Sequence, residues 1–278
     1  MGLSRRPVAG QSSIKMARDL NISPLSTQAA VLKALILREL HVRFGRDNIG
    51  YLWLIGEPMM LATVISSVHY IADAGHGAND MAPFPFTLVG YCLFIIFRGI
   101  FNRAEGAIEG VSSLFHHKMI KPLDIMIAKA VIECLGCASS LIVLLGIGIV
   151  LGIAEPPARP LYLMLGVALI TWWSFGLSLI VAGLTYGHHS LGRFVHPISY
   201  FMVPLSGAFW TMSFLPTKFR DYMGWNPMVT MFELARYGQF RWASAEYLFP
   251  EYAIAVCASL TYVGLILVRR LKYKIQVN

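Results

Sequence analysis

The sequence predicts an all-α integral membrane protein that crosses the bilayer six times. The 278 residues are 56% hydrophobic and 14% charged, with a mean hydropathy of +0.59, whereas soluble domains carry about 25% charged residues. Apolar stretches long enough to cross a bilayer recur along the chain, separated by polar or proline-containing segments. The first residues are polar and lack the apolar core of a signal peptide, so we expect the N-terminus to remain in the cytosol.

The N-terminal part is predicted to lie outside the bilayer core, and residues 27–278 to form one transmembrane domain. Residues 1–26 place basic residues among Gly, Ser and Pro and are expected to form a flexible basic tail. Residues 27–44 predict an amphipathic helix in the membrane interface, although Glu39 and Arg43 interrupt its apolar side. The apolar stripe consists of Leu32, Leu35, Ile36 and Leu40. A direct extension of the first span is the alternative, which the glycine-flanked polar break after this helix disfavours.

Six apolar stretches are predicted to be spans, and they cover residues 49–71, 84–101, 125–153, 161–184, 196–215 and 252–268. In the first, the carboxylate of Glu57 precedes the helix breaker Pro58. Because a charge inside the bilayer costs several kcal/mol, we expect Glu57 to snorkel or to pair with a basic residue. Asp124 is placed to stabilise the start of the third span, and two prolines in the fifth predict kinks.

The segment between the fifth and sixth spans is too polar to cross the bilayer. Asn226 followed by Pro227 predicts an N-cap and a first turn, and residues 228–241 predict a helix of about four turns. We expect this helix to lie in the interface or to re-enter the membrane. With six spans, 18 Lys and Arg fall on the side that holds both termini and 5 on the other, so the positive-inside rule puts both termini in the cytosol.

Motifs for catalysis, nucleotide binding and metal binding are missing from the sequence. It has no G-x-x-x-x-G-K-[ST] loop, so the chain is not expected to hydrolyse ATP by itself. Four of its eight histidines form two adjacent pairs, His116–His117 and His188–His189, a spacing that does not put both on one helix face to hold a metal. Cys134 and Cys137 have C-x-x-C spacing inside an apolar span, where packing is the expected role. Basic residues flank the spans without a basic, aromatic-rich groove, so no nucleic-acid partner is expected.

Four stretches of the chain carry recognisable motifs. Residues 38–58 read R-E-x-x-x-R-F-G-x-x-x-I-G-Y-L-W-x-x-x-E-P. The others are 114–130, with Lys-Pro-Leu-Asp at its centre, the end of the fifth span at 209–216, and 225–236, which begins Trp-Asn-Pro. Together they resemble the ABC-2 type permease family, and the Glu-Pro pair that closes the first motif resembles that of its capsular-polysaccharide export subunits. The resemblance extends over roughly residues 28–272.

The resemblance implies a homodimer of six-span subunits bound to two copies of a cytosolic ABC ATPase. It implies export of a lipid-linked acidic polysaccharide from the cytoplasm across the inner membrane of a Gram-negative cell. ATP and Mg²⁺ are then expected on the ATPase, with no cofactor in this chain. A periplasmic adaptor and an outer-membrane polysaccharide channel complete the route that the resemblance implies.

The resemblance also assigns roles to residues. The helix at 27–44 and the loop at 105–121 are expected to contact the ATPase. The residues expected to couple the two are Arg38, Arg43, Arg46, His116, His117, Lys118, Lys121 and Asp124. Those expected along the translocation pathway are Trp53, Glu57, Trp172, Trp173, Tyr200, Phe209, Trp210, Trp225 and Arg236. For each aromatic residue an interfacial belt or packing is the competing explanation, and Arg236 has Glu233 or lipid headgroups as alternative partners.

Two other functions remain open at this point. The first keeps the transport role and changes the cargo to O-antigen, teichoic acid or a small molecule. The Glu57–Pro58 pair favours the capsule type, since related O-antigen permeases usually carry Gln there. The second is a membrane-embedded transferase, which the sequence disfavours because no cluster of Asp, Glu and His residues has the spacing of a reaction site.

Overall fold

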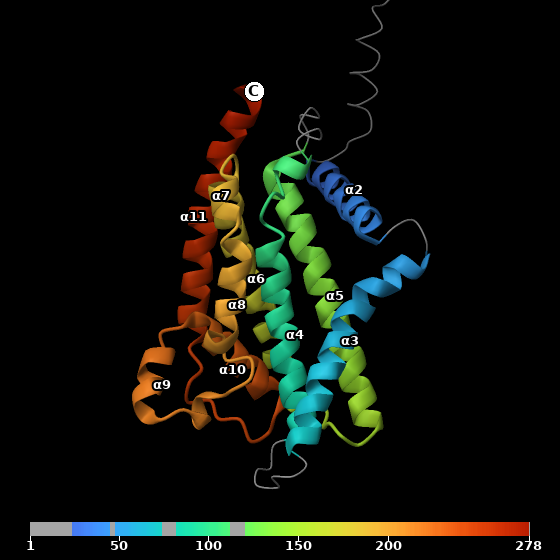
Figure 1. Cartoon of the computed structure of the whole chain (residues 1–278), viewed down its shortest axis with the longest axis vertical. Helices are drawn as coiled ribbons and strands as arrows, with labels where there is room; N and C mark the ends of the chain where they lie inside the picture. The colour runs from blue at the N-terminus through green and yellow to red at the C-terminus, as the bar shows by residue number, and fades with distance from the viewer. Residues whose placement is uncertain (1–23, 45–47, 74–81, 112–119, 278) are drawn as a thin grey trace, which may run out of the picture.

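The computed structural model describes residues 24–44, 48–73, 82–111 and 120–277, and within these ranges the regular elements are all helical. Most of the helices stand side by side in one upright bundle, and α2 (Pro24–Phe44) lies at an angle outside it (Figure 1). The C-terminus and α2 occupy the same end of the bundle (Figure 1). The predicted all-α class is confirmed for this part of the chain. The predicted tail falls outside the described residues, except for the few that begin α2.

Four of the described helices are long and apolar enough to cross a membrane. Each begins with a proline, which is well tolerated there because the first helical turn has no use for the missing N–H. Their positions confirm the helices predicted for the second, third, fourth and sixth spans. They are α4 (Pro83–Asn102), α5 (Pro122–Val150), α6 (Pro160–Thr185) and α11 (Pro250–Val277, with its candidate span at Pro250–Leu271).

The other two predicted spans differ from each other in the structure. The first, at 49–71, lies within the single 26-residue helix α3 (Asn48–Asp73), and Leu52–Val68 is its apolar stretch among the residues whose side chains the structure describes. The fifth, at 196–215, is helical only over α8 (Val195–Leu205). Eleven residues of α-helix are about 16 Å long, about half of the hydrocarbon thickness. The prediction of one continuous fifth span is therefore wrong in its second half.

The chain leaves the helical path after α8 because of its local sequence. Pro204 removes one backbone donor from the last turn, and Gly207 has φ +79, a conformation that glycine adopts without steric cost. The backbone then runs through the short 3₁₀ helix η2 (Met212–Phe214) to α9 (Thr217–Met223). A Cβ at Gly90 of α4 would overlap the carbonyl oxygen of Ala208, so this turn lies directly against α4.

The helix predicted at 228–241 is confirmed as α10 (Pro227–Gln239), and Asn226 caps it by accepting a hydrogen bond from the backbone N–H of Met228 at 3.0 Å. α10 is buried on nearly all sides and packs against α6, α4 and α11. A Cβ at Gly166 or Gly238 would overlap atoms of the facing helix. α10 is thus a core element of the bundle, and its level relative to a membrane stays a prediction.

Candidate functional site

Helix α2 docks on α5 through an apolar centre with polar contacts around it. Leu35 is buried against Val111, Ile125 and Ala128, and Leu32 and Ile36 pack beside them. The helix predicted at 27–44 and its apolar stripe are therefore confirmed, whereas its position in a membrane interface stays a prediction. The residues that interrupt the stripe are the ones that bind α5. The three side-chain pairs are Gln28–Asp124 at 2.6 Å, Glu39–Lys129 at 2.6 Å, and Arg43–Glu133.

Asp124 holds the start of α5. It is 2% exposed, and its Oδ2 accepts a hydrogen bond from the backbone N–H of Lys121 at 3.0 Å. Its Oδ1 accepts the hydrogen bond from Gln28, so one carboxylate both caps α5 and ties it to α2. The predicted role of Asp124 at this helix N-terminus is confirmed.

Glu133 lies at the centre of a charged group that joins α2, α3, α4 and α5. Its Oε1 accepts from Nη1 of Arg43 and from Nε of Arg103, and Nη2 of Arg43 lies 3.7 Å from Oε2 of Glu57. Glu57 therefore has a basic partner, one of the two possibilities predicted for it. Partial burial lowers the pKa of Arg103, just beyond the end of α4, and the Glu133 carboxylate opposes that shift. The carboxylate thus favours the charged form of a guanidinium that burial alone disfavours.

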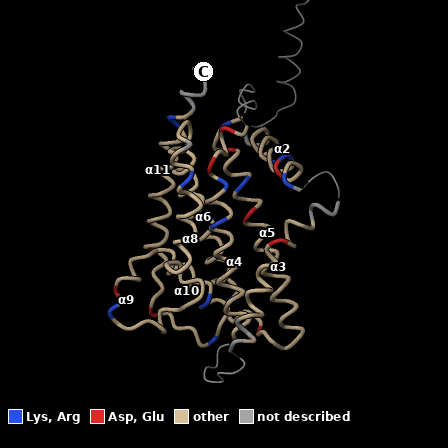
Figure 2. The backbone as a smooth tube through the Cα atoms, in the orientation of Figure 1, with Lys and Arg blue, Asp and Glu red and all other residues tan. Residues whose placement is uncertain are grey.

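Sequence reasoning missed Glu133, although the signal was present. A carboxylate inside an apolar span predicts a cationic partner, and the same argument was available for Glu57. The charges of α4 and α5 gather in the half of the bundle nearer α2 (Figure 2). A Cβ at Gly99 of α4 would overlap the Glu133 carboxylate, so the glycine leaves the room that this carboxylate occupies.

A cavity of about 400 Å³ opens beside this charged group, between α3, α4 and α5. Its apolar lining includes Leu54, Leu61 and Ile95. The charged side chains that line it are Arg43, Glu57, Arg98, Arg103 and Glu133, and Tyr91, Asn102 and His196 add polar groups. An apolar site with a few convergent polar groups is typical of ligand pockets, and this one combines both signs of charge.

Helix α8 and the segment after α4 approach the cavity from the other side. The guanidinium carbon of Arg98 lies 4.2 Å from the centre of the Tyr200 ring. His196 lies 3.7 Å from the carboxylate of Glu105, and Glu109 accepts a hydrogen bond from the backbone N–H of Gly187 at 2.6 Å. The described part of the predicted 105–121 loop is thus tied to α8 and to the turn that precedes α7 (His189–Gly192).

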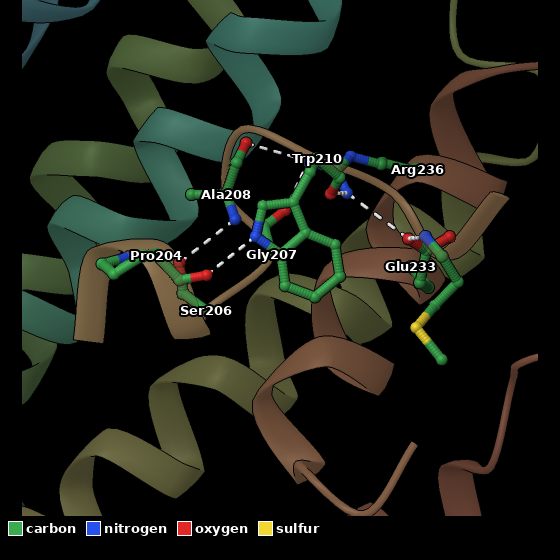
Figure 3. Close-up of polar contacts among 8 residues, drawn as sticks. Pro204, Ser206, Gly207, Ala208, Trp210, Glu233 and Arg236 are labelled. Atoms are coloured by element: carbon green, nitrogen blue, oxygen red, sulfur yellow. Dashed lines mark hydrogen bonds and ion pairs between the residues drawn. The ribbon is translucent and has the colours of Figure 1, made fainter. Parts of the chain in front are cut away.

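The opposite end of the bundle contains a second polar group, centred on Arg236 of α10. Its guanidinium donates hydrogen bonds to the backbone carbonyls of Gly207 at 2.6 Å, of Ala208 at 2.8 Å and of Trp210 (Figure 3). It also lies over the ring of Phe86, 4.2 Å from the ring centre. Arg236 therefore satisfies the carbonyls that the chain exposes where it leaves α8.

Glu233 completes this second group. Its Oε1 accepts a hydrogen bond from the backbone N–H of Met212 at 3.0 Å and lies 3.4 Å from Nη1 of Arg236. Trp210 donates from Nε1 to the carbonyl of Pro204 at 2.8 Å, folding the turn back on α8 (Figure 3). Pairing with Glu233, the alternative considered for Arg236, is the arrangement observed. At 1% exposure, Arg236 has no surface to offer a polymer in this conformation.

The residues predicted to couple to an ATPase fall into two groups. Arg38 and Arg43 lie on α2, and Lys121 and Asp124 lie at the start of α5, so the structure brings them to one end of the bundle. Arg46, His116, His117 and Lys118 lie outside the described residues.

The residues predicted along the pathway are spread over the bundle. Glu57 lines the cavity, and Tyr200 lies beside it through Arg98. Trp173 is buried, with its ring 5.3 Å from that of Phe97. Trp210 and Arg236 belong to the second polar group, and the ring of Phe209 lies 6.4 Å, centre to centre, from that of Tyr91 in the cavity lining. The other three share no site: Trp53 is exposed on α3, Trp172 donates to Thr261 at 3.0 Å, and Trp225 is 77% exposed near α9.

The fold and these contacts define a class: a helical membrane bundle with a flanking helix joined to it by ion pairs. Among the described residues, no group of His, Cys, Asp and Glu has the arrangement of a metal site. The chain belongs to the ABC-2 type transporter family, whose membrane domain matches residues 30–240.

Similar proteins from three bacteria cover most of the chain. It is 32% identical to the capsule polysaccharide export inner-membrane protein CtrC of Neisseria meningitidis serogroup B over 88% of this chain and 92% of that protein. It is 28% identical to the capsule polysaccharide export inner-membrane protein BexB of Haemophilus influenzae over the same shares. It is 34% identical to the polysialic acid transport protein KpsM of Escherichia coli over 77% of this chain and 83% of that protein. The predicted family is thereby confirmed.

Proposed function

We propose that this chain is the transmembrane permease subunit of an ATP-driven exporter that moves lipid-linked capsular polysaccharide from the cytoplasm across the inner membrane. The observation that carries the proposal is the 32% identity to CtrC over 92% of that protein's length. The capsule export proteins of two species and a polysialic acid transport protein share this similarity, and all three are named for the transport of polysaccharide. The chain itself acts as a conduit and carries no catalytic residue.

The proposed assembly contains two copies of this chain and two copies of a cytosolic ABC ATPase, which holds ATP and Mg²⁺. Both termini face the cytosol, as the distribution of Lys and Arg favours. The position of α2 and the C-terminus at one end of the bundle agrees with that orientation. A periplasmic adaptor and an outer-membrane channel then receive the polymer on the other side.

In this assembly α2 is the element that the ATPase moves. A helix that lies on the surface of a bundle transmits a push only if it is fixed to the spans. The pairs Glu39–Lys129 and Arg43–Glu133 fix α2 to α5. Arg103 extends the second pair to α4, so displacement of α2 acts on several spans together.

The test is reconstitution together with its cellular counterpart. Purified chain alone should show no ATP hydrolysis, and addition of the chain to its ATPase should stimulate hydrolysis by that subunit. Deletion of the gene should leave capsular polymer inside the cell, and a plasmid copy should restore polymer at the surface. Hydrolysis by the chain alone, or cells that make no polymer at all, would contradict the proposal and point to synthesis instead.

A further inference from the structure

Among the described residues, Arg98 is the arginine lining the cavity between α3, α4 and α5 that forms no ion pair with a carboxylate. Glu133 is engaged by Arg43 and Arg103, and Glu57 lies near Arg43. Within the described part of the chain, the guanidinium of Arg98 lies over the Tyr200 ring and also interacts electrostatically with the phenol of Tyr91. Three guanidinium groups and two carboxylates line the cavity, which leaves an excess of one positive charge. A charge that is partly removed from water without a counter-ion is costly, so this excess favours the binding of an anion.

The contact with the Tyr200 ring leaves the N–H donors of Arg98 available to a ligand. A guanidinium placed over an aromatic ring uses its face for that contact, while its N–H groups point outward in the plane of the guanidinium. This planar fork matches the two oxygens of a carboxylate or a phosphate. The Tyr200 ring holds the guanidinium in place through its face, and in the described structure it accepts no hydrogen bond from Arg98.

A second group in the cavity also lacks a partner. Oδ1 of Asn102 is buried and forms no hydrogen bond in the described structure, and Asn102 lines the same cavity as Arg98 and the phenol of Tyr91. Buried polar groups are normally paired, so a ligand that brings a hydroxyl group would satisfy it. The guanidinium of Arg98, the amide of Asn102 and the phenol of Tyr91 line the cavity together with apolar side chains. This combination suits an acidic, hydroxylated headgroup carried on a lipid. The volume of about 400 Å³ lies in the range of small-molecule sites.

We propose that this cavity binds one oxyanion, a carboxylate or phosphate on a lipid-linked headgroup, and that Arg98 is the residue that recognises it. The lipid-linked source rests on the proposed export function, whereas binding of the oxyanion does not. The same chemistry is carried by an acidic sugar next to the lipid and by the phosphate of the lipid itself. The site lies in the half of the bundle nearer α2, where displacement of that helix would change the ion pairs around the ligand.

The test is calorimetric titration of the full-length chain in complex with its ATPase, in a neutral maltoside detergent. Octyl glucuronide supplies a carboxylate, dioctanoyl phosphatidylglycerol supplies a phosphate, and octyl glucoside is the neutral control. At least one of the two anions should bind about tenfold more tightly than octyl glucoside, the effect expected for one charged hydrogen-bonding pair. Preference for the glucuronide identifies an acidic sugar as the source, and preference for phosphatidylglycerol identifies a lipid phosphate.

One variant that should weaken anion binding and another that should strengthen it distinguish loss of recognition from misfolding. Arg98→Gln should abolish the preference for the anion, and Arg98→Lys should retain part of it. Glu57→Gln removes a negative charge from the cavity and should tighten anion binding about threefold, which damage to the fold would not do. Arg193→Gln, at an exposed arginine after α7, is the matched control and should bind as the wild type does.

Equal binding of all three compounds, or an Arg98→Gln variant that keeps the preference, would overturn the proposal. The titration contains no transport step, so it can succeed even if the chain proves to export a different cargo. Conversely, if the cells export polymer but the titration shows no preference for an anion, the proposed function stands and the proposed site is refuted.

Discussion

The pair formed by Glu39 and Lys129 provides a sharp test of how α2 is coupled to the bundle. The carboxylate and ammonium are 2.6 Å apart and are 17% and 18% exposed. Two unit charges about 4 Å apart at an effective dielectric constant of about 20 attract by about 4 kcal/mol. Desolvation and loss of side-chain entropy oppose most of this attraction. A net contribution of about 1–2 kcal/mol to the docking of α2 remains, which corresponds to a factor of about ten in the docking equilibrium.

The perturbation is a charge swap. Glu39→Lys places two ammonium groups together, and Lys129→Glu places two carboxylates together, so each single variant should weaken the docking of α2. We expect each to lower the stimulation of the partner ATPase about five- to tenfold. The double variant restores opposite charges in reversed order and should recover stimulation to within about twofold of the wild type. The assay is steady-state ATP hydrolysis by the reconstituted complex.

Lys33→Glu is the control for this experiment. Lys33 is exposed on α2, so its reversal changes the charge of that helix without touching the pair. It should leave stimulation near the wild-type level. If the double variant is no more active than the single variants, or if the single variants stimulate normally, the ion pair does not couple α2 to α5 and the reasoning fails.

Three further predictions concern the polar groups inside the bundle. Arg236→Leu should destabilise the purified protein by about 3–5 kcal/mol, since it removes the cation paired with Glu233 and leaves several buried carbonyls without a donor. Arg236→Lys should cost less, and thermal unfolding in detergent measures both. Glu133→Gln leaves Arg43 and Arg103 without their shared carboxylate and should cost about 1–2 kcal/mol and reduce ATPase stimulation, whereas unchanged stimulation would exclude this group from coupling. Gly90→Ala places a methyl group against the backbone carbonyl of Ala208 in the facing turn and should lower the free energy of unfolding by about 2–3 kcal/mol. A thermal midpoint equal to that of the wild type would show that the turn can move away at little energetic cost.

The helices were largely predictable because hydrophobic length and proline position are local properties of the sequence. The start of α5 at Pro122 and the cap of α10 at Asn226 follow from a few neighbouring residues. The early end of α8 was not predictable in the same way. Residues 206–215 are apolar enough to continue a span, and the turn is stabilised by Arg236, which lies far along the chain.

The charged group was predictable only in part. Amphipathic spacing identified Glu39 and Arg43 as interruptions of an apolar face, yet it could not say that α5 offers Lys129 and Glu133 opposite them. Pairing across helices depends on their crossing geometry, which periodicity does not encode. A charge within an apolar segment predicts that a partner exists, and the identity of that partner requires the fold.

The two polar groups differ in a way that predicts which end of the bundle moves. Around α2 the links are side-chain ion pairs, which can exchange partners as helices shift. Around α10 they are hydrogen bonds from one buried guanidinium to backbone carbonyls, and such an arrangement has few alternatives. We therefore expect motion to begin at α2 and to pivot about α10. Hydrogen exchange of the complex with and without a non-hydrolysable ATP analogue should show altered protection in α2 and the first turns of α5, with little change at residues 204–212. A larger change at 204–212 than in α2 would place the moving element at the other end and refute the pivot.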